Sequence, residues 1–138
     1  MAAEDCPDVP EEIVAELRGI CLALPEVDEE QAWVGHRWVV RRKNFAQVFY
    51  ADEGTTPLLI KIARAIGPGP LLVFRSEGPE LEALRNQGPP FYPAGWGRDV
   101  MGLKLDGHVD WDEVRELVTE SYCVMAPQKL RRLVDRPG

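Results

Sequence analysis

Basic residues gather in one short stretch of the sequence, and their chemistry suits an anionic ligand. They surround Trp38 and Asn44, and they are Arg37, Arg41, Arg42 and Lys43. Guanidinium and ammonium groups bind phosphate or carboxylate, and an aromatic ring can stack on a nucleobase. The stretch is therefore a candidate surface for a phosphate chain or an acidic partner. The alternative is an ordinary solvated face of a pair of strands.

A second basic group lies near the C-terminus. Lys129, Arg132 and Arg136 recur at the spacing of one helix face. These residues would extend a basic surface if the fold brought them to the first stretch. Alternatively, they only solvate the helix and complement the negative end of its dipole.

Two further features are candidates for ligand binding. Residues 91–99 combine aromatic side chains with glycines around Trp96, so Trp96 either lines a small-molecule pocket or closes the edge of the core. Arg75 follows a run of apolar residues, where a charged head must find a partner or reach solvent. Arg75 is thus either a ligand clamp or an ordinary strand-end residue.

The sequence contains no recognisable catalytic signature. Ser121 and Cys123 have no evident base beside them, and the acidic residues that begin at Asp110 are explained by helix capping. Three cysteines and two histidines lack the spacing of a metal site. We therefore expect no catalytic residue, no metal and no cofactor, and a binding protein rather than an enzyme.

The elements that would position these residues follow from periodicity and from turn signals. A helix is expected from Asp8, as its N-cap, to Pro25, and a long helix is expected after Asp110 as its N-cap. Strands are expected at 31–35, 37–43, 45–50, 71–75 and 100–105, and further helices at 78–87 and after Pro127, the last with Leu130, Leu133 and Val134 inside. Residues 56–67 fit a helix slightly better than a buried strand.

This order of elements lacks the regular alternation of strands and helices that produces a parallel sheet. It predicts an α+β fold: a largely antiparallel sheet of about five strands, with helices packed on one face in a two-layer sandwich. The length of 138 residues fits a single domain, 1–138, with residues 1–7 as a frayed tail.

Several short motifs together resemble the MmcQ/YjbR family over residues 13–134. The most specific part is Ser121-Tyr122 followed by Ala126-Pro-Gln-Lys-Leu130, and softer matches occur at Leu24-Pro25-Glu26, at 43–46 and at 100–105. The resemblance implies a curved antiparallel sheet similar to CyaY-like and secretion-chaperone-like folds. Members are commonly described as DNA-binding, so the resemblance also implies a DNA-binding function. The connector at 52–70 is longer than the simplest family pattern.

The net charge of −7 opposes general binding to a phosphate backbone, but it is unevenly distributed. Residues 1–30 carry ten acids and one base, whereas residues 31–104 carry ten bases and six acids. We therefore expect binding of nucleic acid or an acidic partner through the basic part of the sheet. A small-molecule pocket or weak enzyme at Trp96, and a chaperone-like interaction module, remain alternatives.

Neither an apolar run long enough to span a membrane nor a signal peptide is present, so we expect a cytoplasmic protein with reduced thiols. The oligomeric state is left open.

The binding hypothesis requires the separate basic segments of the sequence to lie close together in the fold. It predicts that Arg41 or Arg42, Lys43, and at least one of Lys129 and Arg132 share one face, away from the acidic N-terminal helix.

Overall fold

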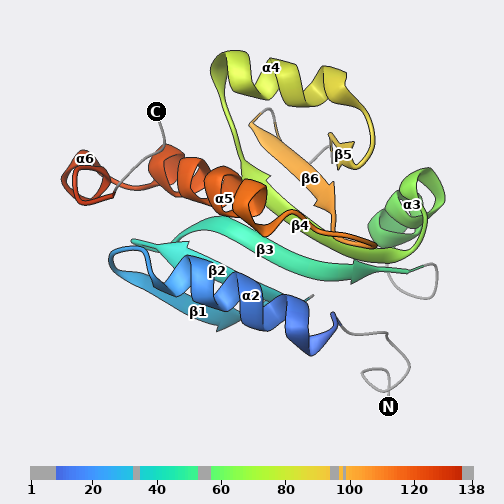
Figure 1. Cartoon of the computed structure of the whole chain (residues 1–138), viewed down its shortest axis with the longest axis horizontal. Coiled ribbons are helices and arrows are strands. Elements are labelled where there is room, and N and C mark those ends of the chain that lie inside the picture. Colours follow the sequence, from blue (N-terminus) through green and yellow to red (C-terminus); the bar gives the residue numbers. More distant parts are fainter. Residues whose placement is uncertain (1–8, 33–34, 53–56, 94–96, 98, 135–138) are drawn as a thin grey trace.

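The computed structural model describes residues 9–32, 35–52, 57–93, 97 and 99–134. It has the expected α+β fold, in which helices pack on an open antiparallel sheet (Figure 1). The helices are α2 (Glu11–Leu22), α3 (Pro57–Ile66), α4 (Gly78–Gln87), α5 (Trp111–Met125) and α6 (Gln128–Arg131). Residues 56–67 thus contain a helix, as the sequence favoured.

The sheet has six strands in the order β1-β2-β3-β4-β6-β5, and every neighbouring pair is antiparallel. The strands are β1 (Val27–Gln31), β2 (His36–Val40), β3 (Lys43–Ala51), β4 (Gly69–Arg75), β5 (Phe91–Tyr92) and β6 (Val100–Lys104). The short strand β5 is not among the expected strands. It exists because Phe91, whose side chain is buried, pairs with Leu103 of β6.

The main core lies between one face of the sheet and the helices α2 and α5. Trp38 and Phe74 point from the strands into this core, where they meet Leu17 of α2 and Tyr122 of α5. All four side chains are almost completely buried. Because apolar burial contributes roughly 25 cal/mol per Å², this layer provides most of the stabilisation that fixes α5 on the sheet.

A smaller apolar cluster lies on the opposite face of the sheet. Phe49 and Leu71 pack there against Ile62 and Ala63 of α3. Side chains of a strand alternate between faces, which explains how Val48 belongs to the main core while its neighbour Phe49 belongs to this one. The sequence favoured this helix but placed all helices on one face of the sheet, whereas α3 forms a small layer on the other face.

Three expectations about element boundaries were wrong. The first strand is β1 at 27–31 instead of 31–35, and its acidic residues are stabilised by cations on neighbouring elements. Arg41 and Arg42 are not in a strand, because β2 ends at Val40 and they form the turn to β3. Leu133 is 69% exposed instead of buried, since α6 ends at Arg131.

The N-terminal helix also begins later than expected. Its N-cap is Pro10, and the helix ends at Leu22, before Pro25. Asp8 and the expected frayed tail lie outside the described residues. The cap at Asp110 is as predicted: its Oδ1 accepts hydrogen bonds from the backbone N–H groups of Asp112 (3.1 Å) and Glu113 (3.2 Å).

Candidate anion-binding site at the end of the sheet

The turn between β2 and β3 presents two arginines at the end of the sheet. Val40 pairs with Lys43, so Arg41 and Arg42 form a two-residue hairpin loop. Both have positive φ, 49° and 68°, as a type I′ turn requires. Such turns favour Asn-Gly, because residues with a Cβ atom are strained there. All three basic residues of this segment, Arg41, Arg42 and Lys43, are exposed.

Glu26 joins this turn to two other parts of the chain. It lies between α2 and β1, and its carboxylate accepts two hydrogen bonds from the Arg41 guanidinium, from Nε at 2.8 Å and from Nη2 at 3.2 Å. These bonds lower the pKa of Glu26, and the charges of Arg41 and Lys129 lower it further against the opposing effect of burial. Arg41 from the hairpin and Lys129 from α6 therefore both act on one carboxylate.

Tyr122 holds the connection between α2 and β1 against α5. Its hydroxyl donates a hydrogen bond of 2.6 Å to the carbonyl oxygen of Pro25, next to Glu26. Its ring meets Phe45 edge-on, with centroids 5.4 Å apart and planes at 90°. Burial raises the pKa of Tyr122, so the hydroxyl stays protonated and remains a donor. Tyr122 thus fixes the position of Glu26 relative to α5.

Ser121 connects α5 to two strands at the same end. Its buried hydroxyl accepts a 2.7 Å hydrogen bond from the backbone N–H of Arg75 in β4 and donates one to the carbonyl oxygen of Phe45 in β3. Direct pairing of these strands runs only as far as Ala46 and Phe74, beside an irregularity in the pairing of β2 with β3. The hydroxyl therefore bridges the strands where their ladder ends.

We call the exposed cations at this end of the molecule the basic end: Arg41, Arg42, Lys43, Lys129 and Arg132. The hairpin, the α2–β1 connection and α6 all lie at the left in Figure 1. Lys129 is an exposed residue of α6 and Arg132 is its exposed C-cap. The arrangement provides guanidinium and ammonium groups from two distant segments around one carboxylate, which suits an extended anion.

The other expected site residues lie elsewhere. Arg37 is on β2, where it faces its register partner Glu30 and forms a 2.8 Å ion pair with it. Arg75 is half-buried at the end of β4, opposite Val100 of β6. Trp96 and Arg136 lie outside the described residues. Within the described ranges, no group of three or more histidine, cysteine or acidic residues is arranged to hold a metal ion.

The chain matches a known protein family. The family model described as YjbR matches residues 22–124, about three quarters of the chain. The chain belongs to the YjbR family. The matched region contains the whole sheet, Glu26, the hairpin arginines, and both Ser121 and Tyr122, whereas Lys129 and Arg132 lie just beyond it. No curated protein matches the sequence.

The motif Ser121-Tyr122 lies within the region that matches the YjbR family model. Both side chains bind backbone groups of other elements, so the motif fixes the position of α5 on the sheet. Sequence reasoning did not find Glu26, whose only signal is its place after Leu24-Pro25 in the family pattern. Among the described residues, no helix is long and apolar enough to span a membrane.

Proposed function

We propose that this YjbR-family protein binds a nucleic-acid backbone through the basic end. The proposal is supported by the placement of the β2–β3 hairpin and α6 at the same end of the molecule. In agreement with this placement, the charges of Arg41 and Lys129 both lower the pKa of Glu26. Glu26 neutralises part of this charge. The exposed Arg42, Lys43 and Arg132 add cations around it.

The geometry of the hairpin favours a phosphate chain over a small anion. A two-residue loop at the end of a sheet is convex and exposed, so it can contact successive phosphates but cannot enclose a single one. Cations that neutralise about four phosphates give a slope of log K against log salt of about −3 to −4. The net charge of −7 opposes binding by the rest of the molecule, so the affinity is expected to be modest.

The experiment is fluorescence anisotropy of labelled single-stranded and double-stranded DNA at salt concentrations between 25 and 200 mM. The variant R42A/K129A removes two exposed cations from different segments, and we expect its affinity to fall about tenfold. The matched control R37A removes a cation that is paired with Glu30 on β2. It is expected to bind within twofold of the unmodified protein.

Three outcomes would contradict the proposal. The first is an absence of DNA and RNA binding at 25 mM salt, where phosphate contacts are strongest. The second is an equal loss of affinity in R37A and in R42A/K129A, which would indicate general electrostatic attraction. The third is tighter binding to polyglutamate than to either nucleic acid, which would identify an acidic protein as the ligand class.

A further inference from the structure

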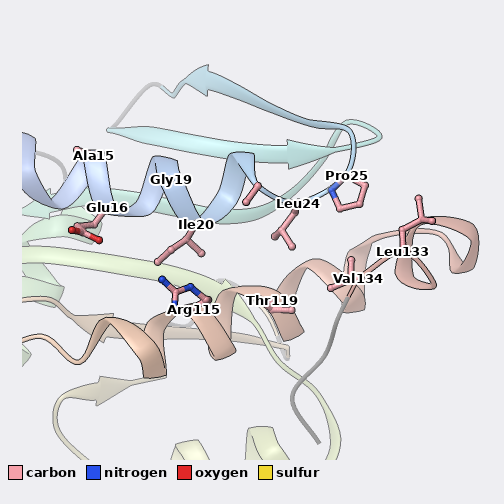
Figure 2. Close-up of a pocket in the computed structure, with 11 residues that line it drawn as sticks. Ala15, Glu16, Gly19, Ile20, Leu24, Pro25, Arg115, Thr119, Leu133 and Val134 are labelled. Carbon is pink, nitrogen blue, oxygen red and sulfur yellow. The ribbon is translucent and has the colours of Figure 1, made fainter.

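A groove runs between α2 and α5, on the side of these helices that faces away from the sheet. Its volume is about 620 Å³. Figure 2 shows Ile20 of α2 and Arg115 of α5 projecting into the space between the two helices, with Leu133 and Val134 at one end. Leu24 lies near this end. The groove is therefore apolar at the end near α6 and more polar toward the start of the helices.

Small residues line the α2 side of this groove. Ala15 and Gly19 of α2 and its C-cap, Ala23, follow one another at intervals of four residues, and all three are exposed. A Cβ atom added at Gly19 would meet no other atom within 4 Å. Glycine inside a helix costs about 1 kcal/mol relative to alanine. Packing within the described part of the chain therefore gives no reason for glycine here, and the space above it is free for another molecule.

The two helices that form the groove are strongly acidic on their exposed sides. Glu16 lines the groove, and the same two helices carry five more exposed carboxylates: Glu11, Glu12, Asp112, Glu113 and Glu116. Among the described residues, Arg115 is the only cation that lines the groove, and it is paired with Asp112 at 3.2 Å. Arg18 of α2 is held by two hydrogen bonds to Glu29. An occupant of this groove must therefore combine an apolar face with positively charged flanks.

We propose that the groove binds a basic amphipathic helix of a partner protein. A helix that presents apolar residues at positions i, i+3, i+4 and i+7 fits a groove between two helices. Lysines or arginines beside this apolar stripe would meet the carboxylates of α2 and α5. A second copy of the chain is a poor occupant, because it would bring two acidic helix layers together. The apolar end of the groove, at Leu133 and Val134, adjoins Arg132 of the basic end, so the cations of the partner helix are expected toward the start of α2 and α5.

The test uses a defined probe: a labelled 14-residue peptide of leucine and lysine with leucines at i, i+3, i+4 and i+7. Its binding to the full chain is measured by fluorescence anisotropy in 150 mM NaCl. The variant G19W fills the groove from an open position, and we expect it to weaken binding at least tenfold. The matched control A83W places tryptophan at an exposed position of α4 and is expected to bind within twofold.

A second variant distinguishes a filled groove from misfolding as the cause of weaker binding in G19W. Leu133 is mostly exposed, so L133D should fold normally and also weaken binding at least tenfold. A peptide of the same composition with scrambled order, and one with glutamate in place of lysine, are both expected to bind at least tenfold more weakly. R42A/K129A is expected to bind the peptide normally, which separates this site from the proposed function.

The proposal would be overturned by unchanged binding in both G19W and L133D. It would also be overturned if the scrambled peptide bound equally well, because charge alone would then explain the affinity. A dimer of the unmodified chain that G19W converts to a monomer, measured by light scattering, would identify a second copy as the occupant instead.

Discussion

Arg41 holds the carboxylate of Glu26 with two hydrogen bonds, although both residues have a backbone in the left-handed region, with φ values of 49° and 57°. A non-glycine residue in this region costs roughly 1 kcal/mol or more. The side chains of the pair are about half exposed, and such surface ion pairs contribute little to stability. The conformation of the hairpin is therefore not explained by the stability that the ion pair provides.

The first prediction concerns this hairpin. Replacing its two residues by the sequence that type I′ turns prefer, in the double variant R41N/R42G, should raise the free energy of unfolding by about 1 kcal/mol. Urea denaturation measures this change. The same variant should bind DNA about tenfold more weakly, so that stability and affinity change in opposite directions. An unchanged or lowered stability would show that the turn is not strained.

The second prediction compares two buried serines. S121A removes the hydroxyl that serves both the Arg75 N–H and the Phe45 carbonyl. Leaving these buried groups without a partner should lower the free energy of unfolding by about 2–4 kcal/mol. Ser76 is equally buried, but its hydroxyl has no hydrogen-bond partner among the described residues. S76A should therefore change the stability by less than about 0.5 kcal/mol, and similar losses in both variants would contradict this explanation.

The third prediction concerns acid stability. Hydrogen bonds from Arg18 lower the pKa of Glu29, burial opposes the shift, and a 3.0 Å bond from the Trp38 indole N–H lowers it further. A carboxyl whose folded pKa lies below its unfolded value of about 4.3 stabilises the fold above that pH. This contribution is lost as the pH falls through the lower, folded value.

The variant E29Q lacks this titration. It should be less stable than the unmodified chain by about 1–2 kcal/mol at pH 7. The difference should shrink as the pH falls from about 5 to about 2. Urea denaturation at several pH values measures both effects. A difference that is constant across this range would show that the charge of Glu29 is not what stabilises the contact.

The fourth prediction concerns the thiols. Cys21 and Cys123 are both buried, and burial raises the pKa of the Cys21 thiol, with a further rise from the charge of Glu29. The thiolate is the form that reacts. In the C6S variant, no thiol should react with Ellman's reagent under native conditions, and two should react in denaturant. Prompt reaction of either thiol in the native protein would contradict the burial of both.

Features that depend on local chemistry could be predicted from the sequence. The start of α5 is one example, because Asp110 caps backbone groups two and three residues ahead. The helix α4 is another, since Leu81 and Leu84 are buried at helical spacing as expected. Periodicity and capping are properties of a few neighbouring residues, so they are visible in the sequence alone.

Features that depend on distant partners could not be predicted. β1 contains Asp28, Glu29 and Glu30, which disfavour a strand by propensity, and the cations that stabilise it lie on α2 and β2. The turn at Arg41-Arg42 lacks the glycine or asparagine that usually marks it. The role of Glu26 arises only when Arg41 and Lys129 come together, which no local pattern encodes.

The acidity of β1 has a consequence for how the molecule behaves at high concentration. An open sheet has two edge strands, whose unpaired backbone groups can pair with another chain and begin aggregation. Here one edge is β1, with exposed Asp28 and Glu30, and the other is β5, which has two residues. Charge at one edge and shortness at the other both oppose strand-to-strand association. Glu29 and Glu30 of β1 bind Arg18 and Arg37. The same acidic strand thus also opposes polymerisation of the protein through the edge of its sheet.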